Sequence, residues 1–425
     1  MSFALGFLPL GLLLLGFPIF LVLLASVSVA LLFFMDVPLT ALHQNLFGAI
    51  DAYALLAIPF FIFAGELMGR GSVADRLVSF VNAGVGSVRG SLAVTTVGSS
   101  ALFGAISGVS AATVATIGRA MLPALRRNGY PEKFSAGLLT AVGAIDIIIP
   151  PSIPMIVYGA AAQQSVPRLY AAGVLPGLLL AGMLCAYVMW YARRHRIGGG
   201  ERFSWAVFGR AAVRGLGALG APVIILGGIY GGVFSPTEAA AVACLYAIVV
   251  ARYFYRELSW RDILASAGTT AVFTGQILII VACANVFGWL LTVHQVPAAL
   301  VQWLTDLHLP GWSLLLAINV LLLAVGCFID PLSAILLLSP LLMPLVTAIG
   351  VDPVHFGIIV TVNLSIGLFH PPFGINIFVA QSVLKLPLES IYRGIVPFVV
   401  IYLIALGLIT YIPEISLWGM RLLLN

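Results

Sequence analysis

The sequence predicts an all-α polytopic membrane protein made of two inverted repeats. Three observations carry this prediction: the composition, a repeated double proline and the distribution of positive charge. Of the 425 residues, 61% are hydrophobic and only 8% are charged, and the mean hydropathy is +1.13. A soluble domain does not have this composition. At about 20 residues per membrane-spanning helix, the chain has room for roughly ten to twelve helical segments.

The double prolines indicate a structural repeat. The pairs Pro150-Pro151 and Pro371-Pro372 begin at positions 150 and 371, a separation of 221 residues. Each pair lies in an apolar stretch long enough to cross a bilayer. Proline lacks a backbone N–H and interrupts a helix, so we expect two related helices that are broken at membrane depth.

Positive charge is distributed unequally between the two copies. No Lys or Arg occurs from Ile263 to Leu384, whereas the first copy is flanked by Arg70, Arg76, Arg89, Arg119, Arg126, Arg127 and Lys133. Positive residues near membrane segments stay on the cytoplasmic side, so matching loops of the two copies face opposite sides. Inverted repeats with broken helices are typical of secondary transporters. The net charge of +5 therefore reports topology, and we expect no nucleic-acid partner.

Each repeat is expected to contain an arm, a re-entrant helical hairpin and a proline-broken transmembrane helix. The first repeat takes residues 55–192, and its hairpin turns at a tip over Gly104–Gly108. The second repeat takes residues 262–384, with its hairpin tip near Asp330-Pro331. Glycine, serine and proline at the tips favour tight turns between apolar legs that are too short to span comfortably.

Three parts lie outside the repeats. Residues 1–54 form an N-terminal helix or helices, and Gly16-Phe17-Pro18 leaves open whether residues 1–34 are one segment or two. Residues 193–261 hold a polar cytoplasmic linker and a helical hairpin that turns at Ser235-Pro236-Thr237. The linker is expected to run through Glu201, Arg202, Arg210 and Arg214. Residues 385–425 form the C-terminal helix.

The chemistry is expected where a hairpin tip meets a broken helix. Unwound carbonyl groups and hydroxyls suit a hard monovalent cation, while helix N-termini favour an anion. The candidate cation ligands are Ser107, Gly108, Ser110, Pro150, Ser152, Asp330, Pro331, Ser333, Pro371 and Pro372. The alternative is that these small residues only permit close helix packing.

Several motifs resemble one known family. They are Ala57–Phe61 (AIPFF), Ala64–Met68 (AGELM), Ser107–Ala112 (SGVSAA), Ile149–Ser152 (IPPS) and Asn363–Gly367 (NLSIG). Over essentially its whole length the chain resembles the large membrane subunit of tripartite ATP-independent periplasmic (TRAP) transporters. The resemblance implies an elevator-type ion-transporter fold, in which hairpins and broken helices move against a scaffold. Residues 1–54, 193–261 and 385–425 would supply that scaffold.

The resemblance also implies partners and an energy source. Na⁺ would be the coupling ion, with no covalently bound cofactor. A small four-helix membrane (Q) subunit and a periplasmic substrate-binding (P) protein would complete the transporter, and the P protein would deliver a small carboxylate. The chain would lie among the lipids of the bacterial inner (cytoplasmic) membrane as a multi-pass protein.

Four residues are candidates for contact with substrate or for ion coupling: Asp146, His370, Asn363 and Asn376. Asp146 and His370 depart from the family pattern, which has small or apolar residues before the first double proline and commonly threonine before the second. A carboxylate inside a membrane segment is costly and indicates function. Asp146 could strengthen a cation site, contact a polar substrate, relay a proton, or bond only to backbone freed by the break. His370 could titrate near neutral pH or cap an exposed carbonyl group.

Two other classes of protein compete with this one. A stand-alone ion- or proton-coupled carrier of similar architecture would need no binding protein. An intramembrane enzyme or a channel is less well supported, because the sequence has no Walker motif, no His-Glu-x-x-His and no nucleophile with a nearby base in order. We therefore expect a transporter subunit rather than an enzyme.

Overall fold

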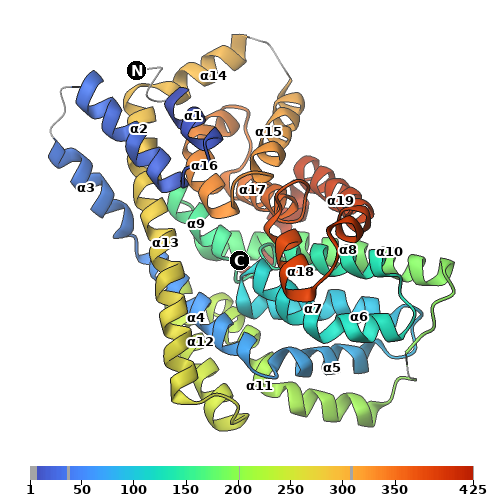
Figure 1. Cartoon of the computed structure of the whole chain (residues 1–425). Helices are drawn as coiled ribbons and strands as arrows, with labels where there is room; N and C mark the ends of the chain where they lie inside the picture. The colour runs from blue at the N-terminus through green and yellow to red at the C-terminus, as the bar shows by residue number, and fades with distance from the viewer. Residues whose placement is uncertain (1–6, 36–38, 201, 307–309, 425) are drawn as a thin grey trace.

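The chain folds into helices that are joined by short turns (Figure 1). The computed structural model describes residues 7–35, 39–200, 202–306 and 310–424, and in these ranges the only β structure is an isolated bridge between Arg89 and Gly199. Among the described residues, seven helices are long and apolar enough to cross a membrane: Tyr53–Arg70, Val166–Arg194, Trp205–Tyr230, Pro236–Phe254, Trp260–Val293, Pro331–Ala348 and Leu388–Tyr411. The prediction of an all-α polytopic membrane protein is confirmed.

The N-terminal part contains separate helices. Helix α1 (Leu8–Leu14) and helix α2 (Ile19–Phe34) are divided at Gly16, which has a φ of +80°, and Pro18, which precedes α2. Glycine adopts positive φ without steric cost, and proline cannot continue the first helix. The question left open for residues 1–34 is answered for the described part, which has two segments. Helix α3 (Leu39–Ile50) follows.

The first repeat has the expected plan. Its elements are a 3₁₀ turn η2 (Tyr53–Leu56), α4 (Ala57–Arg70), the arm α5 (Val73–Val85), the hairpin legs α6 (Ser91–Ser107) and α7 (Ser110–Arg127), α8 (Glu132–Val142), a 3₁₀ turn η3 (Gly143–Ile145), α9 (Ile153–Ala161) and α10 (Val166–Arg194). The tip is shorter than predicted, because α6 continues through Gly104 and the chain turns at Gly108 and Val109.

The linker prediction was partly wrong. Helix α11 (Trp205–Tyr230) begins early enough to include Arg210 and Arg214, because the apolar period of the membrane helix extends back to Trp205. Only Arg202 remains in the described part of the linker, and Glu201 lies outside the described residues. Helix α12 (Pro236–Val249) begins with Ser235 as its cap, as the sequence indicates, and passes into the π-helical turn η4 (Val250–Phe254).

The second repeat retraces the first. Its elements are α13 (Trp260–Val293), the arm α14 (Val296–Asp306), the hairpin legs α15 (Gly311–Gly326) and α16 (Pro331–Ala348), and the broken helix formed by α17 (Pro353–Gly367) and α18 (Ile375–Leu384). The expected single C-terminal helix is two helices, α19 (Leu388–Tyr411) and α20 (Glu414–Leu424). Pro413 separates them, because it cannot supply the N–H that a continuous helix needs.

The two repeats pack into each other. Hairpin leg α7 of the first repeat packs against α18 of the second, and α16 of the second packs against α9 of the first. Helix α19 lies along α8, where Gly137 and Gly394 bring the two backbones into contact. In Figure 1 the long helix α13 stands at one side of this unit, and it packs against α2, α3 and α4. The hairpins and breaks therefore meet between α13 and the other helices.

Candidate functional site

A cavity of about 330 Å³ lies where both hairpin tips meet both helix breaks. Gly108 and Ser110 line it from the first tip, and Asp330 and Pro331 line it from the second. Helix α13 supplies a further wall, with Phe273, Gln276, Ile277 and Ile280. The cavity is thus shared by the hairpins and breaks of both repeats and by α13, the first helix of the second repeat.

Four helices begin at this cavity. Their first residues are Ser110 of α7, Ile153 of α9, Pro331 of α16 and Ile375 of α18, and all four line the cavity. A helix N-terminus carries partial positive charge and favours an anion. Side chains cap α9 and α16, through Ser152 and Asp330, whereas α7 and α18 have no side-chain cap. No Lys or Arg side chain lines the described wall of the cavity, which leaves the helix ends as its source of positive potential.

The first tip depends on two glycines. Gly108 has a φ of +60°, in the left-handed region, and a Cβ there would lie 3.1 Å from the carbonyl oxygen of Pro151. A Cβ on Gly65 of α4 would lie 2.8 Å from the Cα of Ser107. Both positions need glycine, because the backbone turns sharply and neighbouring chains approach it closely. The predicted tip residues are therefore held against α4 and against the first break.

Asp146 lies in the first break and is fully buried. The Ser107 hydroxyl donates a hydrogen bond of 3.0 Å to its Oδ2, and the Thr113 hydroxyl donates another to the same oxygen. Oδ1 accepts no hydrogen bond, and no cationic side chain forms an ion pair with this carboxyl group among the described residues. The hydrogen bonds of Asp146 thus come from side chains of the hairpin rather than from backbone freed by the break.

A second contact joins the two repeats directly. The Ser110 hydroxyl donates to Oδ1 of Asn376 at 3.1 Å and accepts from its Nδ2 at 2.9 Å. Nδ2 also donates to the carbonyl oxygen of Thr140 at 3.2 Å. The sequence identified Ser110 and Asn376 as separate candidates at different repeats. The structure brings them together in one buried contact.

The prolines and Ser152 shape the first break. Pro150-Pro151 and Pro371-Pro372 each have a cis peptide bond. Ser152 caps α9, because its hydroxyl accepts from the backbone N–H of Met155 at 3.4 Å and donates to the carbonyl oxygen of Ile147. This hydroxyl is engaged with its own segment, so Ser152 serves as a helix cap in this conformation.

The second tip differs from the first. Asp330 caps α16, because its Oδ1 accepts from the backbone N–H groups of Leu332 and Ser333, both at 3.0 Å. The Ser333 hydroxyl donates to Oδ2 of the same carboxylate. Asp330 is half-buried and faces the cavity. Both carboxylate oxygens of Asp330 thus accept hydrogen bonds from the first turn of α16.

His370 and Asn363 have local partners. Nδ1 of His370 lies within hydrogen-bond distance of the Pro371 carbonyl oxygen and 3.2 Å from Sγ of Cys327, which favours the carbonyl-capping interpretation. Asn363 donates to Asn319 at 2.6 Å and to the Ile359 carbonyl oxygen at 3.0 Å. None of these contacts joins Asn363 to another candidate, so the structure separates it from Asn376.

Two residues of the site were not identified as candidates from the sequence. Thr113 lies one helical turn after Ser110, on the same face of α7, and that spacing could have identified it. Gln276 is an amide within a long apolar helix, and such a residue is a functional hypothesis in a membrane segment.

The donor set suits a hard cation better than a transition metal. Within the described residues, no three His, Cys, Asp or Glu side chains gather as metal ligands. At the first tip the available groups are a carboxylate oxygen, hydroxyls and carbonyl oxygens. Oxygen ligands of this kind are preferred by hard cations.

Inverted repeats, paired hairpins and broken helices around one central cavity define a membrane transporter of the secondary type. A family model described as "Tripartite ATP-independent periplasmic transporter, DctM component" matches residues 7–415. The chain belongs to this family. Together with the seven apolar helices, this makes it a multi-pass protein of the bacterial inner membrane.

Two relatives and one solved structure illustrate the similarity. The chain is 42% identical over 398 residues to the C4-dicarboxylate TRAP transporter large permease protein DctM of Pseudomonas aeruginosa, covering 92% of each. It is 38% identical over 410 residues to the ectoine/5-hydroxyectoine TRAP transporter large permease protein UehC of Ruegeria pomeroyi, covering 96% of each. The YdaH transporter of Alcanivorax borkumensis superposes with a TM-score of 0.67 at 16% identity, covering 98% of this chain and 100% of that one. This last likeness shows the fold alone.

Proposed function

We propose that this chain is the large transmembrane subunit of a sodium-coupled secondary transporter that imports an organic acid by an elevator mechanism. The observation that carries the proposal is Asp146, a fully buried carboxyl group at the junction of hairpin tip and helix break with no cationic partner among the described residues. An isolated buried charge is strongly unfavourable, so the group must bind a cation or a proton.

Sodium fits the groups around Asp146. Oδ1 is free to accept a cation, while hydroxyls of Ser107 and Thr113 hold Oδ2. Because Asp146 belongs to the break and the two hydroxyls belong to the hairpin, a cation bound at Oδ1 would stabilise the contact between them. Ion binding would in this way favour one arrangement of tip and break over another.

The cavity supports an anionic substrate. Its volume of about 330 Å³ suits a small molecule, and four helix N-termini meet at its wall. The hydroxyl of Ser110 and the amide of Gln276 supply hydrogen-bonding groups beside mostly apolar side chains. A carboxylate placed at the N-terminus of α7 or α18, neither of which has a side-chain cap, is the interaction that this wall favours.

The position of the cavity supports an elevator mechanism. One wall belongs to α13, whereas the other walls belong to the hairpins and breaks. A displacement of the interlocked hairpins and broken helices along α13 would carry the cavity with them. The words "tripartite" and "periplasmic" in the family description support two partners, a small membrane subunit and a periplasmic binding protein that delivers the substrate.

The test is uptake into proteoliposomes that contain this chain, its small subunit and its binding protein. An inward sodium gradient should drive uptake, and omission of the binding protein should abolish it. Uptake without the binding protein would favour the stand-alone carrier. Uptake driven by a proton gradient alone would mean that a proton rather than sodium binds Asp146, and it would overturn the sodium assignment.

A further inference from the structure

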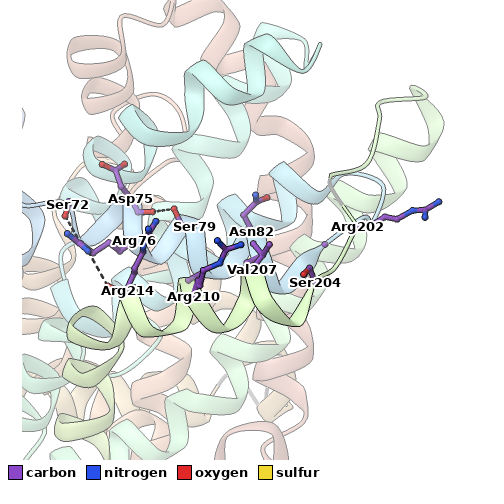
Figure 2. A pocket seen from close by; sticks show the side chains of 13 residues that line it. Ser72, Asp75, Arg76, Ser79, Asn82, Arg202, Ser204, Val207, Arg210 and Arg214 are labelled. Atoms are coloured by element: carbon purple, nitrogen blue, oxygen red, sulfur yellow. Dashed lines mark hydrogen bonds between the residues drawn. The ribbon is translucent and has the colours of Figure 1, made fainter.

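A second cavity, of about 570 Å³, lies far from the transport site in the chain's basic region. It runs between the arm α5 and the first turns of α11, and the linker closes one end (Figure 2). Arg76, Arg202, Arg210 and Arg214 line it, and Asp75 is the one acidic residue among the described lining residues. By the positive-inside rule this is the cytoplasmic side.

One of the four arginines is neutralised by the protein. A nitrogen of Arg76 lies 3.2 Å from Oε1 of Glu257, and its guanidinium stacks 3.8 Å from the centre of the Tyr255 ring. Partial burial raises the pKa of Glu257, but hydrogen bonds from Ser72 and Arg76 outweigh it and hold that pKa below its ordinary value. Glu257 is therefore ionised, and Arg76 is a structural ion-pair partner that joins α5 to the segment before α13.

The other three arginines have no such partner. Arg210 and Arg214 lie one helical turn apart on α11, and in Figure 2 their side chains rise from α11 toward α5. In the described part of the chain, neither they nor Arg202 forms an ion pair. The carboxylate of Asp75 points away from α11 in the same view. Arg210 and Arg214 thus bring positive charge to the groove that no described carboxylate pairs with, and an external anion can neutralise it.

Polar groups and exposed apolar side chains lie next to these arginines. Ser79 and Asn82 line the groove from α5 and can donate hydrogen bonds to an anion. On α11, Trp205, Val213 and Leu216 are exposed by 77%, 64% and 57%. An exposed Trp at the start of a membrane helix is typical of the headgroup level of a bilayer. One helix therefore presents arginines to the groove and apolar side chains to the bilayer.

We propose that this groove binds the phosphate of an anionic phospholipid of the inner leaflet, with the acyl chains lying on the exposed apolar residues of α11. Arginine recognises phosphate by paired hydrogen bonds, and basic pockets between helices on the cytoplasmic side suit lipid headgroups. The lipid would link α5, the arm of the first repeat, to α11, which lies outside both repeats.

The experiment is native mass spectrometry of the delipidated full chain titrated with phosphatidylglycerol and with phosphatidylethanolamine. The variant is Arg210→Ala with Arg214→Ala, and the matched control is Arg193→Ala with Arg194→Ala, two exposed arginines in the last turn of α10 outside the groove. The wild type and the control should bind phosphatidylglycerol about tenfold more tightly than phosphatidylethanolamine. The double variant should bind phosphatidylglycerol about tenfold more weakly than the wild type does. Arg210→Gln alone should reduce the affinity for phosphatidylglycerol less than the double variant does. It replaces the double variant in the test if that variant fails to fold.

Further arms of the titration distinguish the source of the phosphate. Inorganic phosphate and glycerol phosphate should displace the lipid only weakly, because they lack acyl chains. Equal binding of the two lipids by the wild type, or unchanged binding by the double variant, overturns the proposal. Displacement by inorganic phosphate at concentrations equal to those of the lipid overturns the membrane source, and identifies the groove as a site for soluble phosphate.

Discussion

The two hairpin tips carry related sequences but handle negative charge in different ways. Against the first tip lies Asp146 of the first break, which is fully buried and accepts hydrogen bonds from hydroxyls of the hairpin. At the second tip Asp330 is half-buried, and its own helix turn satisfies it. A carboxylate at a helix N-terminus is stable as an anion, whereas one inside a packed junction needs a cation.

The difference in burial follows from the packing around the breaks. The backbone of the first break is enclosed by α4, the first hairpin and α10, and Gly104 leaves room for Asp146 against α6. The second break is more open, with Pro372 and Phe373 exposed. Repeated sequence thus produces the same turn of the chain without producing the same environment. We expect the first tip to couple the ion and the second tip mainly to shape the cavity.

The largest expected effect comes from Asp146→Asn. The amide keeps the shape of the side chain and removes its charge, so sodium-dependent uptake should fall by about tenfold or more, since removing one partner of a buried charge pair costs several kcal/mol. Initial uptake rates against sodium concentration measure this. Asp330→Asn is the matched control, and it should reduce uptake only a few-fold. A larger effect at Asp330 would reverse the comparison of the tips.

Next in size is Gly104→Ala. The added methyl group would lie 2.6 Å from Oδ1 and 2.8 Å from Cα of Asp146. Overpacking of this kind costs about 1–3 kcal/mol, so the melting temperature should fall. Gly326→Ala, at the end of the first leg of the other hairpin, has its nearest neighbour at 3.3 Å and should be milder. Gly182→Ala, which has nothing within 4 Å, should have no effect. Equal destabilisation at Gly104 and Gly182 would refute the close packing at Asp146.

The contact between the repeats gives a smaller effect. Ser110→Ala and Asn376→Ala should each lower stability, and the double variant should lose less than the sum, with a coupling of about 0.5–1.5 kcal/mol. Thermal unfolding of the four forms in detergent measures the coupling. Ser333→Ala combined with Asn376→Ala should be additive, because Ser333 bonds to Asp330 instead. Additivity in the first cycle would mean that the cross-repeat hydrogen bond contributes nothing.

The smallest effects concern the affinity for sodium. Ser110→Ala and Ser333→Ala should each raise the sodium concentration for half-maximal uptake by about two- to fivefold, in keeping with the loss of one hydrogen bond. Ser110→Ala should have the larger effect, since Ser110 begins the helix whose Thr113 donates to Asp146, whereas the Ser333 hydroxyl is engaged with Asp330. If neither variant changes the sodium dependence, the assignment of cation ligands to the hairpin tips is wrong.

Much of the fold was predictable because it depends on local chemistry. Apolar stretches predicted the helices, double prolines predicted both breaks, and the absence of Lys and Arg from Ile263 to Leu384 predicted the inversion. The start of α11 was misplaced, because arginines on the first turns of a membrane helix resemble a polar linker. The division at Gly16 and Pro18 could not be decided from the sequence, because a proline can also kink a continuous helix.

The location of the site could be predicted from the sequence, but the partners of its side chains could not. Ser107, Ser110, Asp146 and Asn376 do gather at the first tip, as polar residues next to a break should. The pairing of Ser110 with Asn376 joins positions 266 apart, and only the tertiary packing brings them together. Asn363 lies on α17, shortly before the second break, yet its side chain lies on the face of α17 that contacts Asn319 of α15. Which face of α17 meets which neighbour is a property of the whole fold.

The contact of α8 with α19 has a consequence for biogenesis. The Tyr402 hydroxyl donates to the carbonyl oxygen of Ala141, which was synthesised 261 residues earlier, and Gly394 touches Gly137 along the same seam. During insertion, the early broken helix lacks its Tyr402 donor and its partner along this seam until nearly the whole polypeptide has left the ribosome. A premature stop before α19 should therefore expose the amino-terminal half to membrane proteolysis rather than leave it as a stable fragment.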